Sequence, residues 1–229
     1  MRTGVLNENS VVMGIPHLLL ASQSPRRREL LALLELPFEV QVAQVAEIPQ
    51  AGEPPHGLVV RLSRDKARAV DARPNTIAIA CDTVVALDGE LLGKPRDAAG
   101  ATTMLARLRG RSHAVYSGIT VLETASGRAL TDVVEAQVLM RAYSDAEITA
   151  YVASGDPLDK AGAYAIQHAE FHPVAELLGC YANVMGLPLC HLTRSLRAWG
   201  IEPVGDVPAA CQARTGCQCT LYATILGGQ

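Results

Sequence analysis

The stretch LLLASQSPRRRELL, residues 18–31, joins an apolar segment to a leucine-rich segment through a short polar turn. The apolar run from His17 to Ala21 predicts a buried strand. Ser24 is a good helix N-cap and Pro25 fits the first helical position, so we expect a helix to begin directly after the turn. This unit of strand, turn and helix indicates a fold in which strands and helices intermix.

Three arginines, Arg26 to Arg28, occupy the first turn of this predicted helix. The helix dipole makes that end positive, so it favours carboxylates there and disfavours three cations. A bound anion would compensate, because the free backbone N–H groups, the serines and the arginines together suit a phosphate. The alternative, a solvated charged face, has equal weight on this segment alone.

The rest of the chain repeats this mixture of elements. Apolar runs and alternation predict strands, apolar residues at helical spacing predict helices, and two alternating segments around ASGR, residues 125–128, predict a hairpin. We therefore expect an α/β fold with a mixed, twisted sheet flanked by helices. The predicted strands are 17–21, 38–42, 76–87, 113–122, 128–140 and 163–166. One helix is predicted to begin after Ser24, three more cover 58–70, 98–108 and 144–152, and a final helix ends near Trp199.

Length and composition favour a single domain. The chain has 229 residues, of which 49% are hydrophobic and 19% charged, with a mean hydropathy of +0.17. It can bury a core and differs from charge-rich disordered sequences. We expect an N-terminal extension over 1–15, the folded domain over 16–203, and a flexible cysteine-containing tail over 204–229.

The N-terminal region lacks the marks of a membrane or secretory segment. The apolar run over 11–21 is interrupted by Gly14 and Pro16 and is shorter than a membrane span requires. Arg2 is the one early cation, Glu8 intrudes, and no cleavage-type end follows the apolar part. We expect a cytoplasmic protein with no membrane partner.

Charge argues against a nucleic-acid-binding module. The formal net charge is -3, the pI is about 6.1, and aromatic residues make up 4% of the chain. Such modules use a basic surface with interleaved aromatic residues. Any contact with phosphate is therefore expected to be local.

The six cysteines show no paired C-x-x-C spacing, so free thiols are expected. Cys211, Cys217 and Cys219 together with His191 form one conceivable zinc set. Their spacing is irregular, and a loose tail is the preferred interpretation.

Lysine occurs only at positions 66, 94 and 160, in a chain that otherwise uses arginine. A compact ammonium on a flexible stem is chemically distinct from a planar guanidinium, so these positions are candidates for specific work. Convergence of Lys66 and Lys94 with the arginines would favour a polyphosphate ligand.

Two carboxylates are candidates for binding the divalent ion that polyphosphate chemistry requires. Asp82 interrupts TIAIACDTVVAL, residues 76–87, where a carboxylate is costly without a partner or a metal. Glu47 lies on a predicted loop. The alternatives are an aspartate that caps a turn and an ordinary exposed acid.

Six ordered motifs then make a family resemblance specific. They cover about residues 17–200, and they resemble the Maf family of septum-formation-inhibitor-like nucleoside triphosphate pyrophosphatases. Within that family the chain is similar to the branch that acts on dTTP and UTP rather than the branch that acts on 7-methyl-GTP. The motifs are SQSPRRREL, CDTVV, GKPRD, HAVYSG, DKAGAYAIQ and YANVMGLPL.

The resemblance implies hydrolysis between the α and β phosphates, giving the monophosphate and pyrophosphate, with Mg²⁺ or Mn²⁺. It implies that Asp82, aided by Glu47, is the general base or metal carboxylate. The expected catalytic set is Asp82, Glu47, Lys66 and Lys94, with Glu47 and Asp82 as metal ligands. The expected substrate-binding set is Ser22, Arg26, Arg27, Asp159, Lys160 and Gln167, of which Gln167 would read the base or position water.

The resemblance also implies an inosine-triphosphatase-like fold, a homodimer, and removal of dTTP, UTP or modified pyrimidine triphosphates from the nucleotide pool. The alternative function is a non-catalytic nucleotide-binding regulator of cell division. That protein would not need Asp82 and Glu47, so their joint presence favours an enzyme.

Three positions depart from the family pattern. Cys81 replaces the usual alanine before Asp82, and Ser117 stands where the family often has threonine, which preserves a hydroxyl. His168 follows Gln167 in place of the usual glycine, and we expect its side chain to narrow or re-aim the base pocket.

Overall fold

The computed structural model describes residues 16–71 and 73–227, so the expected extension over 1–15 lies outside the described residues. Within them, a seven-stranded mixed sheet has the order β2-β1-β3-β5-β6-β7, with β4 paired to β3. The three strands β2, β1 and β3 are parallel, and the remaining pairs are antiparallel. This confirms the predicted α/β class and mixed sheet. The strands are β1 (His17–Leu20), β2 (Phe38–Val40), β3 (Thr76–Leu87), β4 (Glu90–Leu92), β5 (Ser112–Glu123), β6 (Ala129–Met140) and β7 (Val174–Leu178).

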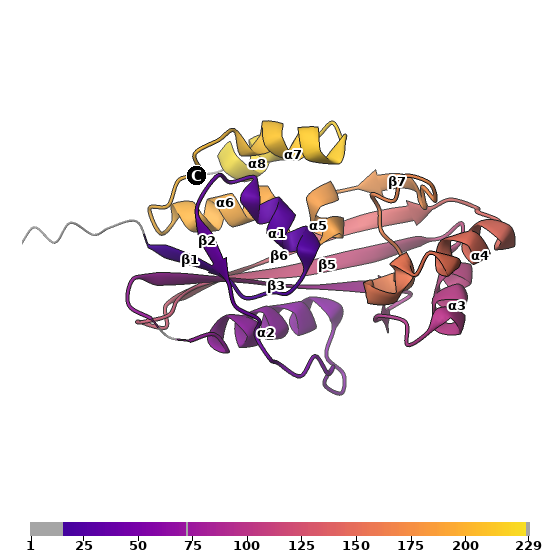
Figure 1. Ribbon diagram of the computed structural model, residues 1–229, viewed down its shortest axis with the longest axis horizontal. Coiled ribbons are helices and arrows are strands. Elements are labelled where there is room, and N and C mark those ends of the chain that lie inside the picture. The colour runs from indigo at the N-terminus through magenta and orange to yellow at the C-terminus, as the bar shows by residue number, and fades with distance from the viewer. Residues whose placement is uncertain (1–15, 72, 228–229) are drawn as a thin grey trace, which may run out of the picture.

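Helices cover both faces of the sheet (Figure 1). One face carries α2, and the other carries α1, α5 and α6, while α3 and α4 lie at one end. The α-helices are α1 (Pro25–Ala32), α2 (Pro55–Arg68), α3 (Ala98–Leu108), α4 (Asp145–Ala153), α5 (Tyr181–Met185), α6 (Leu189–Arg197), α7 (Val207–Thr215) and α8 (Leu221–Gly227), and the 3₁₀ turns are η1 (Asp156–Asp159) and η2 (Ala161–Ala163).

Close packing of α2 on the sheet depends on a glycine. Leu58, Val59 and Leu62 on α2 are buried against the sheet. A Cβ atom at Gly118 of β5 would lie 2.3 Å from the carbonyl oxygen of Val59, a distance that backbone atoms cannot tolerate. Gly118 therefore sets how near α2, which carries Lys66, approaches the sheet.

One edge of β3 has a gap between neighbouring strands. β1 pairs with β3 over Thr76–Ile79, and β4 pairs with it over Val85–Leu87. In the described part of the chain, residues 80–84 of β3 are consequently paired with β5 alone. The gap lies at the carboxyl end of β1, the place where open α/β sheets commonly bind ligands.

Several elements match the sequence-based prediction, and one predicted strand is wrong. β3 and α3 have the predicted bounds, and Ser144 and Glu147 form the predicted capping box of α4. The strand predicted over 163–166 is absent, because Gly162 (φ 69) and Ala163 (φ 60) adopt left-handed backbone. The short strands β4 and β7 were not predicted.

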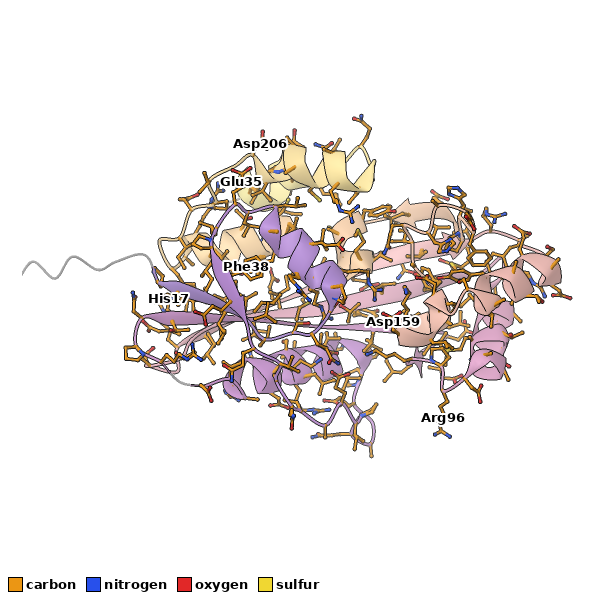
Figure 2. All side chains as sticks on the ribbon, viewed as in Figure 1. His17, Glu35, Phe38, Arg96, Asp159 and Asp206 are labelled. Atoms are coloured by element: carbon orange, nitrogen blue, oxygen red, sulfur yellow. The ribbon has the colours of Figure 1, made fainter. Side chains whose placement is uncertain are left out.

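The segment 204–227, expected as a flexible tail, forms α7 and α8 instead of irregular chain. Asp206 caps α7 by accepting a hydrogen bond from Ala209 N at 3.0 Å, and Val207 is buried in the main core. The ion pair between Arg214 and Glu29 (2.5 Å) ties α7 to α1. Figure 2 shows Asp206 beside Glu35, just after α1.

A small apolar pocket between this segment and α5 and α6 gathers cysteine side chains. They are unbridged, and burial raises the pKa of Cys190 and Cys211 to about 12, so both thiols stay protonated at neutral pH. The cysteines that line the pocket are Cys180, Cys190, Cys211, Cys217 and Cys219. Among the described residues, no helix combines the length and apolarity needed to cross a membrane.

Candidate active site

A cavity of about 350 Å³ opens at the gap beside β3. It brings together all the predicted site residues except Asp82, which lies behind Lys66. Cations outnumber carboxylates on its walls. The predicted residues that line it are Ser22, Arg26, Arg27, Glu47, Lys66, Lys94, Asp159, Lys160 and Gln167.

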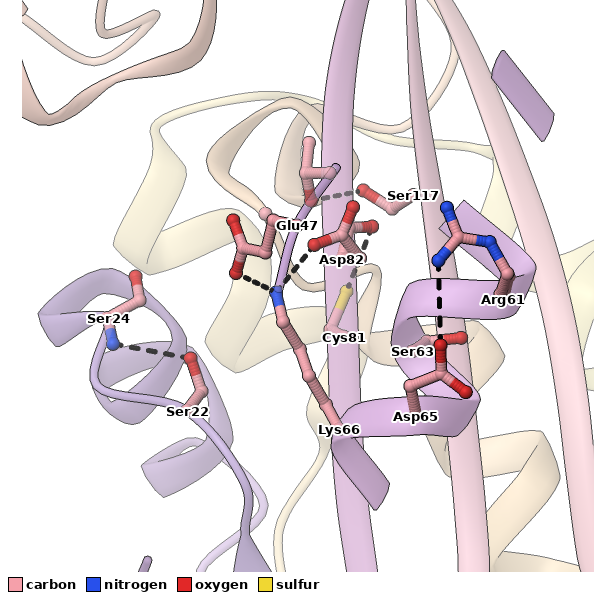
Figure 3. Close-up of polar contacts among 12 residues, drawn as sticks. Ser22, Ser24, Glu47, Arg61, Ser63, Asp65, Lys66, Cys81, Asp82 and Ser117 are labelled. Carbon is pink, nitrogen blue, oxygen red and sulfur yellow. Dashed lines mark hydrogen bonds and ion pairs between the residues drawn. The ribbon is translucent and has the colours of Figure 1, made fainter. Parts of the chain in front are cut away.

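The first wall is the turn between β1 and α1. Ser24 caps α1, since its hydroxyl oxygen accepts a hydrogen bond from Arg27 N at 3.4 Å, and Pro25 takes the first helical position. Ser22 Oγ accepts from Ser24 N at 3.2 Å (Figure 3). Arg26 and Arg27 line the cavity, whereas Arg28 is exposed outside it. Arg26 and Arg27 therefore fit the predicted phosphate-binding site, whereas Arg28 fits the alternative of a solvent-exposed charged face.

Arg27 is fixed by contacts to three separate segments. Its Nε donates to the carbonyl oxygen of Gly186 at 2.9 Å, Nη1 to Ser22 Oγ at 3.3 Å, and Nη2 to Thr83 Oγ1 at 3.2 Å. Gly186 ends α5 with φ 111, a conformation that favours glycine. The guanidinium is therefore held in place before any ligand binds.

The second wall centres on Lys66 of α2, which bridges two carboxylates (Figure 3). Its Nζ lies 2.5 Å from Glu47 Oε1 and 2.6 Å from Asp82 Oδ1. Asp82 is only 5% exposed, so the predicted need for a partner is met by this ammonium. Because side chains alternate across a strand, Asp82 reaches α2 on one face of the sheet while Thr83 reaches Arg27 on the other.

The charge environment favours ionised Glu47. Partial burial raises its pKa, but the hydrogen bond from Lys66 and the positive charges of Lys66, Lys94 and Arg27 outweigh burial, so the pKa lies below its ordinary value. Lys94 lies on the turn after β4, which is joined to η2 by a hydrogen bond from Gly162 N to the carbonyl oxygen of Gly93 at 3.1 Å. The turn that carries Lys94 is therefore anchored to η2.

The carboxylates fit a divalent cation. Oxygens of Glu47 and Asp82 converge on one point, which the Lys66 ammonium occupies. Mg²⁺ often binds through one or two carboxylates together with substrate phosphates. Within residues 16–71 and 73–227, no group of three or more His, Cys, Asp or Glu is placed to hold a metal. The remaining ligands would have to come from substrate or water.

The third wall is formed by η1 and the residues that follow it. Lys160 Nζ contacts Asp159 Oδ1 at 2.6 Å and Asp156 Oδ1 at 2.9 Å, so its charge is already balanced. Asp159 also lies 3.7 Å from Arg26. Asp156 was not among the site residues predicted from the sequence. Burial raises its pKa, but hydrogen bonds from Tyr151 and Lys160 outweigh burial and lower it overall.

The cavity lining also includes Gln167 and the apolar side chains of Val85 and Val115, together with Tyr164. His168, expected to narrow the base pocket, is not part of the lining. Its Nδ1 accepts a hydrogen bond from Phe171 N at 3.0 Å, and its ring packs edge-on against Tyr151. The imidazole therefore does not narrow the cavity itself, and the part of the expectation that concerns re-aiming the base pocket stays a prediction.

Thr83 and Gly186 are site residues that the sequence analysis missed. Thr83 directly follows Asp82 in CDTVV, and Gly186 belongs to YANVMGLPL, so both motifs had been noticed for other residues. Their contacts with Arg27 span 56 and 159 positions of sequence and could not be inferred from spacing.

The chain is similar in sequence to known proteins over most of its length. The family model described as Maf-like protein matches residues 17–199. A protein of Salinibacter ruber named dTTP/UTP pyrophosphatase is 51% identical over 79% of this chain and 90% of its own length. A protein of Anaeromyxobacter dehalogenans with the same name is 49% identical over 84% of this chain and 99% of its own.

Among solved structures, a HAM1 protein from Coxiella burnetii is similar with a TM-score of 0.40 and 18% identity, over 56% of this chain and 74% of that one. The family model covers most of the chain and includes every residue of the cavity wall. The chain therefore belongs to the Maf family.

Proposed function

We propose that the protein is a nucleoside triphosphate pyrophosphatase that hydrolyses dTTP and UTP to the monophosphate and pyrophosphate. The observation that carries this proposal is the convergence of Arg26, Arg27, Lys66 and Lys94 on one cavity whose lining also includes Gln167 and apolar side chains. A triphosphate matches the cations, and a base matches the apolar part of the lining. The names of the relatives from Salinibacter ruber and Anaeromyxobacter dehalogenans support the same substrates.

Phosphate binding falls to the first wall. The N-terminus of α1 offers free N–H groups and a positive dipole, and Arg27 adds N–H donors held in a fixed orientation. Arg26 would exchange its 3.7 Å contact with Asp159 for a phosphate oxygen. Lys66 and Lys94 would reach the phosphates from the other side, so charge that develops during cleavage meets cations on two sides.

The carboxylates would supply the remaining chemistry. Glu47 and Asp82 would hold Mg²⁺ or Mn²⁺, which would neutralise phosphate oxygens when bound. For either role Lys66 would have to leave its position between the two carboxylates and move to the phosphates. Asp82 would then serve as the metal carboxylate with Glu47 or as the general base that accepts a proton from the attacking water. Gln167 would contact the base, and the size of the cavity would favour a pyrimidine, since a purine needs more room.

The wider biological role rests on the family resemblance. We propose a homodimer that works in the cytoplasm and removes dTTP, UTP or modified pyrimidine triphosphates from the pool. Light scattering on the purified full chain would report twice the monomer mass for a homodimer, and the monomer mass would contradict it.

The test is pyrophosphate release from dTTP, UTP, CTP, 7-methyl-GTP and inosine triphosphate, with Mg²⁺, with Mn²⁺ and with a chelator. We expect release from dTTP and UTP that needs the metal and is largely lost in Asp82→Asn. Asp71→Asn is the matched control, because Asp71 is exposed and outside the cavity. Tight nucleotide binding without turnover in any arm would favour the non-catalytic regulator, and unchanged activity in Asp82→Asn would overturn the role given to that carboxylate.

A further inference from the structure

A line of two hydroxyl groups runs from Arg27 into the protein, through Thr83 in the cavity wall to Ser117, which does not line the cavity. Thr83 Oγ1 lies 3.2 Å from Arg27 Nη2 and 2.8 Å from Ser117 Oγ. Ser117 Oγ in turn lies 3.3 Å from the backbone oxygen of Asn183 on α5. Thr83 and Ser117 are paired across β3 and β5, so the sheet register places the two hydroxyls side by side.

The two ends of this line fix the direction of every hydrogen bond in it. A guanidinium can only donate, and a backbone carbonyl can only accept. Ser117 therefore donates to Asn183 O and accepts from the Thr83 hydroxyl. Thr83 in turn keeps its lone pairs for the N–H of Arg27.

The far end of the line is rigid. Asn183 is fully buried, and its Nδ2 donates to the carbonyl oxygen of Val115 at 3.1 Å. The same short helix, α5, ends at Gly186, whose carbonyl oxygen holds Arg27 Nε. Arg27 is thus fastened to α5 twice, once directly and once through the two hydroxyls.

This anchoring leaves part of the guanidinium for a ligand. Arginine has five N–H donors. In the described part of the chain, three of them are used on Gly186, Ser22 and Thr83, which leaves one on each terminal nitrogen. One donor on each terminal nitrogen can bond phosphate oxygens, provided the guanidinium plane is held in one orientation.

We propose that Ser117, which does not line the cavity, is a positioning residue: acting through the Thr83 hydroxyl, it orients Arg27 for the substrate's phosphates. The inference rests on the proposed function in taking Arg27 as a phosphate ligand. It adds that phosphate affinity depends on a buried hydroxyl of β5. Because the contact is a hydroxyl contact, threonine at position 117 should serve as well as serine.

The test compares Ser117→Ala, Thr83→Val and the double variant in steady-state hydrolysis of dTTP. We expect Ser117→Ala to raise KM roughly three- to tenfold, the worth of one hydrogen bond, with a smaller change in kcat. Ser117→Thr should restore most of the affinity. Ser112→Ala, an exposed serine at the start of β5, is the control.

The double variant separates positioning from general damage. If Ser117 acts through Thr83, removing both hydroxyls should raise KM no more than Thr83→Val alone. KM unchanged in Ser117→Ala, or effects of the two single variants that multiply in the double variant, would overturn the inference. A purely structural role would instead lower the melting temperature without changing KM.

The same proteins separate this inference from the proposed function. Absence of turnover in the wild type would overturn the pyrophosphatase proposal. The dissociation constant of inorganic triphosphate, measured by calorimetry, would then replace KM. We expect it to differ between the variants by the same factors as those given above for KM.

Discussion

Arg27→Ala should cost far more catalytic efficiency than removal of its neighbour Arg28. Arg27 lines the cavity with two N–H donors left for phosphate, whereas Arg28 lies outside and is exposed. Hydrogen bonds to charged groups contribute about 1.5–3 kcal/mol each, so the loss of two should cost about 3–6 kcal/mol. That corresponds to a decrease in kcat/KM of about 160-fold to 25,000-fold.

The assay is the initial rate of pyrophosphate release from dTTP and UTP at several substrate concentrations. Arg27→Lys should lie between the wild type and Arg27→Ala, because it keeps the charge and loses the fork. Melting temperatures recorded on the same samples identify any variant that has lost its fold. Equal losses in folded Arg27→Ala and Arg28→Ala would refute the assignment of phosphate binding to one side of α1.

The remaining predictions concern stability and the support of the site. Burial lowers the pKa of His113 to about 4, so between about pH 6.5 and pH 4 the unfolded chain binds a proton that the folded chain does not. Stability should fall with falling pH by up to about 3 kcal/mol over that interval. Measured by urea unfolding, the free energy of unfolding should fall less with falling pH in His113→Gln than in the wild type. The exposed His56→Gln should behave as the wild type, and the same pH dependence in all three proteins would contradict this prediction. Ser144→Ala should destabilise by about 1 kcal/mol through loss of the α4 cap, and an unchanged urea midpoint would count against it. Gly118→Ala should lower the melting temperature and activity together, because α2 must move with Lys66; a stable, active variant would show that the 2.3 Å approach to Val59 is not required.

Local sequence signals predicted the elements whose signals were strong. The apolar run over Thr76–Leu87 is buried almost throughout, and the Ser144 and Glu147 pattern determines a helix start without help from the rest of the chain. β7 escaped prediction because its side chains are mostly exposed at the sheet edge and show no burial pattern. The strand predicted over 163–166 was wrong because the backbone of Gly162 and Ala163 is left-handed.

The candidate site divides in a similar way. Motif resemblance selected the residues that meet in the cavity, but it did not show which of them are already paired. Lys160 is balanced by Asp156, four positions earlier, so that pair depends on the local turn at η1. Lys66 stands between Glu47 and Asp82 because helix packing on the sheet brings three separate segments together. The Lys66 contacts depend on tertiary structure, so composition and spacing could not supply them.

The central proposal is cleavage between the α and β phosphates, and ³¹P NMR of dTTP incubated with the wild-type protein and Mg²⁺ tests it most directly. We expect signals of dTMP and pyrophosphate to grow in equal amounts, with no dTDP at any time. The formation of dTDP and orthophosphate would mean that the cavity directs water to the terminal phosphate, and would contradict the proposed reaction.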